Sequence, residues 1–128
     1  MPWNVELNIN QKIIELTYAG IVTPKALEEA FCAAVKLATE NDVSLFLADC
    51  SDMIGGHSVA DLYFLISIFE ASGFHPRSRE AIVLPALDTS QQDVAFYETA
   101  CLNRGYEVKI FPNRDEALNW LTKSAVRI

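Results

Sequence analysis

The stretch Val43-Ser44-Leu45-Phe46-Leu47-Ala48-Asp49 decides the fold of this chain. Its residues from 43 to 48 are apolar except for one serine, and an acidic residue ends the run. A short apolar run without alternation is typical of a strand that other elements cover on both faces, as in a parallel sheet. We therefore expect a buried strand at 43–48, with helices on either side of it in the sequence.

The remaining segments complete an alternation of strands and helices. Residues 3–9 and 12–18 alternate apolar with polar side chains and predict an antiparallel hairpin that ends near Gly20. Capping residues and apolar stripes predict helices at 24–41, 58–71, 90–102 and from 113, and further strands at 81–84 and 106–110. The order ββαβαβαβα predicts an α/β fold with a five-stranded mixed sheet and four helices.

Length and charge indicate one globular domain that does not bind nucleic acid. The chain has 128 residues, too few for two independent cores, so we expect a single domain over 1–128. Ten Lys and Arg against 17 Asp and Glu give a net charge of -7, which repels nucleic acid and anionic membranes. The one basic cluster, His75, Arg77 and Arg79, is expected to be a solvated loop.

The cysteines and the start of the chain indicate a reducing compartment. Cys32, Cys50 and Cys101 are far apart and odd in number, which fits neither a disulfide framework nor a metal pair. Cys32 and Cys101 fall at apolar helix positions, so we expect both in the core. The first residues lack a secretory signal pattern, and no apolar run approaches the ~20 residues of a membrane span. We expect a cytoplasmic protein without integral membrane association.

The segment after the buried strand is the first candidate for a ligand site, because ligands favour the carboxyl ends of strands in open α/β sheets. Backbone N–H groups near two glycines and a helix start can approach an anion. The candidate residues are Asp49, Ser51, Gly55, Gly56, His57 and Ser58. The alternative is that the glycines only turn the chain.

Catalytic and metal sites are weaker candidates. Cys50 and His57 suggest a thiolate activated by an imidazole, although no flanking signature accompanies them. Asp49, Asp52 and the two histidines have no spacing typical of metal ligands. We therefore expect no enzyme, no metal and no cofactor, with Cys50 a buried thiol.

The helix that begins at Ser58 carries two apolar stripes instead of one. Such a helix needs cover on both sides. The cover is a neighbouring helix, a homodimer contact or the wall of an apolar pocket. The candidate residues for a pocket or an interface are Tyr63, Phe64, Ile68, Phe96 and Tyr97. Aromatic stripes at helical spacing are more often core than pocket.

Several segments resemble a known family. They are Tyr18–Thr23, Leu45–Asp49, Glu107–Phe111 and Asp115–Leu121. Together they resemble the STAS domain superfamily, in its SpoIIAA-like (STAS/SEC14-like) bacterial branch, over residues 5–122. The resemblance implies the fold of that family and a regulatory role like that of STAS-type anti-sigma-factor antagonists.

The resemblance also implies a phosphorylated serine at the start of the helix after the buried strand. Ser58 stands at that place. The acidic residue before the serine and the glycine after it, both part of the family motif, are absent here. The alternative is that Ser58 only caps the helix, which is worth about 1 kcal/mol.

The leading interpretation is a non-catalytic regulatory or protein-interaction module. The SEC14 side of the resemblance implies the alternative, a small carrier or sensor of an apolar or lipid ligand, and a hydrolase with Cys50 and His57 ranks third. An interaction module exposes an apolar patch without a deep cavity, whereas a carrier encloses a pocket of roughly 300 Å³ or more.

Overall fold

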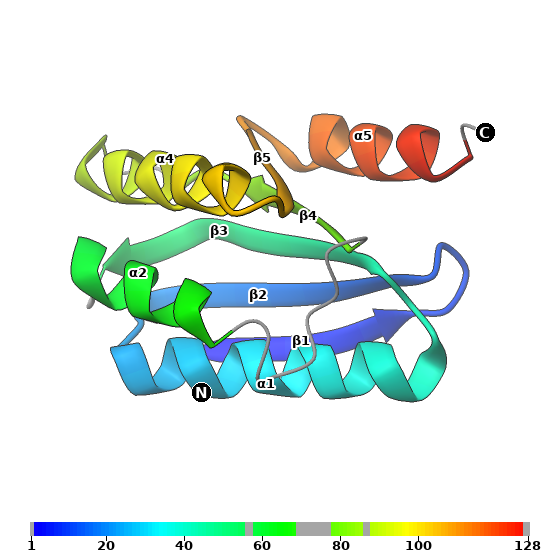
Figure 1. Ribbon diagram of the computed structural model, residues 1–128, viewed down its shortest axis with the longest axis horizontal. Helices are drawn as coiled ribbons and strands as arrows, with labels where there is room; N and C mark the ends of the chain where they lie inside the picture. Colours follow the sequence, from blue (N-terminus) through cyan, green and yellow to red (C-terminus); the bar gives the residue numbers. More distant parts are fainter. Residues whose placement is uncertain (1, 56–57, 69–77, 86–87, 127–128) are drawn as a thin grey trace.

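The computed structural model describes residues 2–55, 58–68, 78–85 and 88–126, which form one five-stranded sheet with helices on both faces (Figure 1). The strands are β1 (Trp3–Asn8), β2 (Ile13–Ile21), β3 (Leu45–Gly55), β4 (Arg79–Val83) and β5 (Glu107–Phe111). The helices are α1 (Pro24–Asn41), α2 (Val59–Ser67), α4 (Asp88–Asn103) and α5 (Arg114–Val126). This order confirms the α/β pattern ββαβαβαβα.

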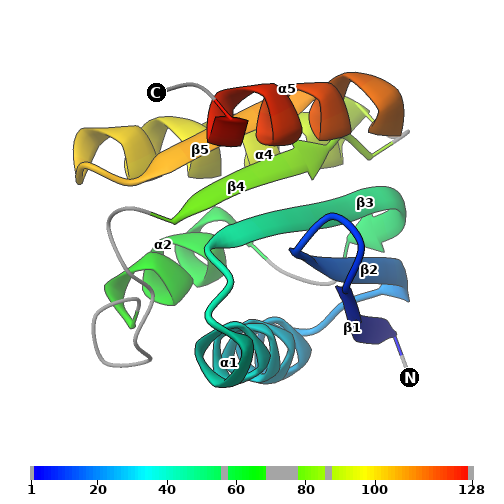
Figure 2. The ribbon, with the colours of Figure 1, turned by 90° about the vertical axis from the view of Figure 1, so that its right-hand side faces the viewer.

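The strands lie in the sheet in the order in which they occur in the chain. β1 and β2 pair antiparallel, and each later strand pairs parallel with the strand before it. Because right-handed crossovers that advance in one direction keep to one face, α1, α2 and α4 share a face of the sheet. α5 follows the last strand and packs on the other face, as Figure 2 shows for α1 and α5.

Two cores form, one on each face of the sheet. β3 contributes to both, because neighbouring residues of a strand point to opposite faces. Phe46 lies in the larger core, with α1, α2 and α4, whereas Leu47 lies in the smaller core, with α5. The smaller core consists of Ile13, Leu47, Ala81, Val83, Phe111, Ala117 and Leu121. The apolar run is therefore covered on both faces, as predicted.

Helix boundaries follow the capping residues at both ends of the chain. The backbone N–H of Ala26 donates to Thr23 Oγ1 at 3.2 Å, and proline occupies the first turn of α1. The backbone N–H of Glu116 donates to Asn113 Oδ1 at 2.9 Å at the start of α5. Each contact satisfies a helix-end donor that has no partner within the helix. The predicted starts of α1 and α5 are confirmed.

β3 is longer than predicted, which corrects the loop expected over residues 49–58. It continues to Gly55 because β2 continues to Ile21 beside it, and these two residues are paired. The register shifts twice between the two strands, so the extension contains bulges. Exposed polar side chains interrupt this half of the strand, and for that reason no apolar run marks it in the sequence.

Three further expectations are wrong. Cys32 is exposed, because it lies one helical turn from Glu28 and Lys36 on the outer side of α1. α4 begins at Asp88, so Ser90 lies inside the helix and not at its cap; capping patterns place a boundary only to within a few residues. Arg79 begins β4 instead of lying in a solvated loop, because it pairs with Leu45 of β3 and Glu107 of β5. Its Nε also forms an ion pair with Glu107 at 2.9 Å.

Other expectations concern residues that the structure does not describe. The predicted end of the second helix, near 71, and the basic residues His75 and Arg77 lie outside the described residues. Among the described helices, none is long and apolar enough to cross a membrane.

Candidate functional site

The carboxyl half of β3 contains three residues of the predicted anion loop. Asp49 Oδ1 accepts hydrogen bonds from the backbone N–H of Ser51 at 3.0 Å and from its hydroxyl at 2.6 Å. Gly55 has a φ of 133°, a backbone angle that residues other than glycine rarely adopt. Gly56 and His57 lie outside the described residues. Asp49 and Ser51 thus bond each other on a strand, and they do not form a loop.

Ser58 caps α2 through reciprocal hydrogen bonds with Asp61. The N–H of Asp61 donates to Ser58 Oγ at 3.2 Å, and the N–H of Ser58 donates to Asp61 Oδ2 at 2.7 Å. This capping box confirms the predicted helix start. The Asp61 carboxylate already lies at the positive end of the helix dipole, which is where an external anion would otherwise bind.

We expect Ser58→Ala to lower the free energy of unfolding by about 1 kcal/mol, because the substitution removes the side-chain acceptor of the helix cap. Urea unfolding followed by circular dichroism measures the loss. Ser58→Asn keeps a capping acceptor and is the matched control, with stability close to that of the natural chain. Equal losses in the two variants would show that the side-chain acceptor is not the source of the loss.

Cys50 does not have the properties of a catalytic nucleophile. Its side chain is buried in the larger core, on a strand rather than in an accessible loop. Burial, with Glu80 and Asp49 nearby, raises the pKa of the Cys50 thiol well above its usual range. A thiol in this state stays protonated at neutral pH, whereas nucleophilic cysteines need a lowered pKa. Cys50 is therefore a buried thiol, as expected from the sequence.

α2 leaves its second apolar stripe uncovered by the described part of the chain. Leu62, Leu65 and Ile66 are buried against the sheet, whereas Tyr63 and Phe64 are exposed by 46% and 60%. The exposed surfaces of α2 and α4 meet at Tyr63 and Phe96, whose ring centroids are 6.4 Å apart. We call the exposed described residues of these two helices the α2–α4 face: Ala60, Tyr63, Phe64, Ser67, Gln92, Phe96, Thr99, Leu102 and Asn103.

Arg104 borders the α2–α4 face. Its guanidinium carbon lies 4.5 Å from the centroid of the Tyr63 ring, and its Nη2 donates a hydrogen bond to the Tyr63 hydroxyl. Stacking and hydrogen bonding together hold the ring of Tyr63 in place. The sequence patterns singled out neither Arg104 nor Leu102, because the helical stripes alone do not show which helix packs beside α2.

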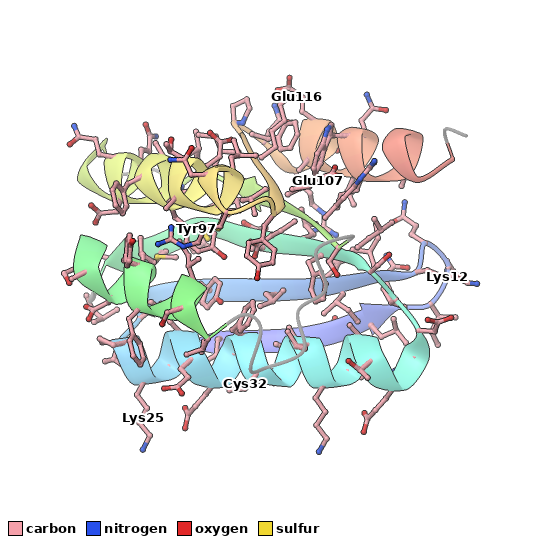
Figure 3. The ribbon with its side chains drawn as sticks, in the orientation of Figure 1. Lys12, Lys25, Cys32, Tyr97, Glu107 and Glu116 are labelled. Carbon is pink, nitrogen blue, oxygen red and sulfur yellow. The ribbon has the colours of Figure 1, made fainter. Side chains whose placement is uncertain are left out.

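The α2–α4 face carries no charged residue, which distinguishes it from other helix surfaces of the chain. Its exposed residues are apolar or uncharged polar. α1, by contrast, exposes Lys25, Glu28, Glu29, Lys36 and Glu40, and Figure 3 shows Lys25 extending away from the sheet. The half-buried acids of the two helices are Asp61, Asp93 and Glu98, of which Asp61 and Glu98 accept hydrogen bonds from backbone N–H groups.

The five predicted pocket or interface residues occupy three environments. Tyr63, Phe64 and Phe96 lie on the α2–α4 face, and Ile68 is half-buried against the larger core. Tyr97 faces the sheet, as Figure 3 shows, and is buried. Successive residues of a helix point about 100° apart, so neighbours such as Phe96 and Tyr97 can face solvent and core.

Glu80 is the functional candidate that the sequence patterns missed. It lies on β4, and its side chain is buried among the apolar residues of the larger core. The predicted strand began one residue later, at Ala81, so Glu80 was left in the preceding loop. A charged residue next to a strongly apolar strand was the signal that could have identified it.

Glu80 borders a small internal cavity. The Tyr97 hydroxyl donates to Glu80 Oε1 at 3.0 Å. Burial raises the pKa of the Glu80 carboxyl to about 7, although the hydrogen bond from Tyr97 acts in the opposite direction. The cavity has a volume of about 40 Å³ and is lined by Tyr18, Leu27, Phe31, Ala48, Cys50, Met53, Leu62, Leu65, Glu80, Ile82, Val94 and Tyr97.

A larger hollow lies at the surface. It has a volume of about 390 Å³ and is lined by Ile66, Ser67, Arg104 and Tyr106. Two of these residues, Ser67 and Arg104, are exposed, so the hollow is open to solvent. Among the described residues, no group of three or more His, Cys, Asp or Glu is arranged to hold a metal ion.

Comparison with known proteins identifies similar solved structures. No family model matches the sequence, and no curated protein matches it. An uncharacterised DUF3478 protein with a SpoIIAA-like fold from Shewanella loihica PV-4 is 18% identical, with a TM-score of 0.61, and the match covers 93% of this chain and 91% of that chain. The anti-sigma factor antagonist SpoIIAA in its unphosphorylated form is 10% identical, with a TM-score of 0.56, and the match covers 91% of this chain and 94% of that chain.

Proposed function

We propose that this chain, which has the SpoIIAA-like fold of STAS domains, is a single non-catalytic module that binds another protein through its α2–α4 face. The observation that carries the proposal is the charge-free, aromatic composition of that face. One of the similar structures is an anti-sigma factor antagonist, which is a regulatory protein. A regulatory role in the cytoplasm is the corresponding proposal for this chain.

The composition of the α2–α4 face is that of an interface centre. Interface centres are depleted in charged residues and enriched in aromatic residues and arginine. The face contains Tyr63, Phe64 and Phe96, and Arg104 borders it through its contact with Tyr63. Residues of these types contribute most of the binding energy in protein interfaces.

The charge of the chain indicates the chemistry of the partner. A net charge of -7 makes two copies of the chain repel each other at long range and attracts a basic protein. We therefore propose that the occupant is a different protein, with an uncharged apolar contact surface surrounded by basic residues. A homodimer through α2 is the alternative outcome.

The carrier interpretation has less support. The internal cavity of about 40 Å³ is far below the volume of roughly 300 Å³ or more that a ligand pocket needs. The larger surface hollow is open, and Arg104 and Ser67 give it a polar lining unsuited to a lipid tail. An exposed apolar face without an enclosed deep pocket among the described residues favours the interaction module.

A phosphoswitch at Ser58 is not part of the proposal. The Ser58 hydroxyl donates to Asp61 Oδ2 at 3.0 Å, so a phosphoryl group on this oxygen would lie beside a carboxylate. Like charges at this distance repel, and the capping box would be lost. The geometry supports Ser58 as a helix cap.

We expect Phe64→Asp and Phe96→Asp each to weaken partner binding by a factor of about 30 or more, as hot-spot substitutions do. The partner is first captured by crosslinking in the cells of origin, and its affinity for each purified variant is then measured by calorimetry. Both side chains are exposed, so the fold, checked by circular dichroism, should be retained.

Ile9→Asp is the matched control. Ile9 is 75% exposed in the β1–β2 turn and does not belong to the α2–α4 face. The proposal requires that the captured protein bind this variant as tightly as the natural chain. Equal binding by all variants, or self-association as the sole interaction in sedimentation, would overturn it.

A further inference from the structure

Among the residues that the structure describes, no ion pair compensates the carboxyl group of Glu80. The ion pairs of the described residues, Arg79 with Glu107 and Arg114 with Glu15, do not include Glu80. The hydroxyl of Tyr97, 3.0 Å from Oε1, is the hydrogen-bond donor that reaches Glu80 among these residues. A buried carboxylate with one neutral donor and no cation is strongly destabilised relative to the neutral acid.

The titratable groups that surround Glu80 in the larger core are neutral, and the charged groups that act on two of them are Asp49, on Cys50, and Arg104, on Cys101. β2 contributes Tyr18, β3 contributes Cys50, and α4 contributes Tyr97 and Cys101. Burial raises the pKa of all four groups, so none is charged at neutral pH. The side chains that α1 and α2 contribute to the cavity are apolar: Leu27, Phe31, Leu62 and Leu65.

The cavity provides space for water beside the carboxyl group. Its volume of about 40 Å³ exceeds the roughly 10–15 Å³ that one water molecule requires. A carboxylate in an apolar interior is stabilised mainly by hydration, so ionisation favours any state that admits more water. α1, α2 and α4 all line the cavity on the side away from the sheet. We expect α4 to move because it carries the Tyr97 hydroxyl that bonds Glu80, and α2 to move with it because α2 packs against α4.

We propose that Glu80 is a buried proton-binding site that controls how α2 and α4 pack on the sheet. With the proton bound, the neutral carboxyl group keeps the hydrogen bond from Tyr97 and the two helices stay closed over the cavity. When the proton passes to solvent, water enters to hydrate the carboxylate and the two helices loosen.

This proton site lies directly beneath the α2–α4 face. Phe96, which lies on that face, directly precedes Tyr97 in the sequence, and Leu62 and Leu65 flank Tyr63 and Phe64. Loosening α2 and α4 would therefore change the relative positions of the exposed aromatic rings. The inference does not require a partner, so it can hold even where the proposed binding function fails.

We expect Glu80 to lose its proton in the physiological pH range, and only the helices on one face of the sheet to loosen. The raised pKa of Glu80, about 7, means that the proton is lost near neutral pH. α5 packs on the opposite face, in the smaller core, away from the cavity. Amides of α5 therefore provide an internal reference that should keep its protection.

Hydrogen exchange measured by mass spectrometry tests the inference. We expect the protection factors of α2 and α4 to fall by roughly 50-fold between about pH 5 and about pH 8, because the open state releases the proton more readily. In Glu80→Gln the protection factors should be independent of pH. Glu6→Gln, at an exposed position of β1, is the control and should follow the natural chain.

A direct titration keeps the inference testable if Glu80→Gln does not fold. Carbon NMR of the Glu80 carboxyl in the natural chain should show a midpoint near 7. Tyr97→Phe should move this midpoint upward, because the hydroxyl hydrogen bond favours the anion. A midpoint in the ordinary range of glutamate, or protection factors that fall equally in Glu80→Gln and the natural chain, would overturn the inference.

Discussion

We expect Glu80→Gln to raise the free energy of unfolding by about 3 kcal/mol at about pH 8 and to leave it nearly unchanged at about pH 4. Glutamine has the same shape as the neutral acid and still accepts the hydrogen bond from Tyr97, but it cannot ionise. The difference between the variant and the natural chain therefore isolates the cost of ionising Glu80 in the core.

The sign follows from the two protonation equilibria. The pKa of Glu80 is about 7 in the folded chain, compared with an ordinary value of 4.5. Below the ordinary value both states are protonated, and the stabilising contribution of the neutral carboxyl is fully present. Between the two values the unfolded chain has lost its proton while the folded chain keeps it, so stability falls as pH rises. Above about 7 the loss is complete and the curve is flat.

Urea unfolding at several pH values checks this expectation. The curve of Glu80→Gln should separate from that of the natural chain between about pH 4.5 and about pH 7, at about 1.4 kcal/mol per pKa unit. Tyr97→Phe should lower the free energy of unfolding. Because the pKa of Glu80 is higher in this variant, its stability curve should go on separating from that of Glu80→Gln up to a higher pH. Parallel curves for Glu80→Gln and the natural chain would show that the pKa of Glu80 is the same in the folded and unfolded chains.

Leu121→Ala should cost between about 2 and 5 kcal/mol of unfolding free energy. Leu121 is fully buried on α5, and it packs against the strands through the smaller core of seven buried residues. A core of this size has few other side chains that can fill a cavity. We expect the variant to loosen α5 before the larger core unfolds.

Leu118→Ala is the matched control on the same helix. Leu118 is half-buried at the edge of the smaller core, so its truncation should cost clearly less. Denaturant unfolding measures both changes, and the fluorescence of Trp120, whose ring lies 5.6 Å from that of Phe111, reports the packing of α5. Equal costs for Leu118→Ala and Leu121→Ala would show that the smaller core does not hold α5.

The candidate site was predictable in part. The second apolar stripe of the helix after Ser58 singled out Tyr63 and Phe64, and both are exposed in the structure. Their exposure itself was not predictable, because it depends on where α4 lies beside α2. For the same reason the sequence predicted the same pocket or interface role for Phe96 and Tyr97, although Phe96 faces solvent and Tyr97 faces the sheet.

Glu80 and Cys32 show two limits of prediction from sequence patterns: the exact start of a strand, and the side of a helix on which a residue lies. Placing the start of β4 at Ala81 instead of Arg79 left Glu80 outside the strand, so its burial was not considered. Cys32 has an apolar side chain, but its phase on α1 is that of Glu28 and Lys36. The first error is a misplaced element boundary, and the second is a misjudged angular position on a helix, where each residue turns the side chain by about 100°.

The sequence by itself determined the kinds and order of the elements, the antiparallel hairpin and the apolar segment that begins β3, because capping and periodicity are local properties of the chain. The predicted strand began two residues too early, since β3 starts at Leu45 and not at residue 43. The tertiary structure alone decided the order of the strands, the placement of α5 on the second face, the length of β3 and the burial of Glu80. The physical reason is that a local pattern records which side of an element is apolar, whereas the packing of distant segments decides what covers it.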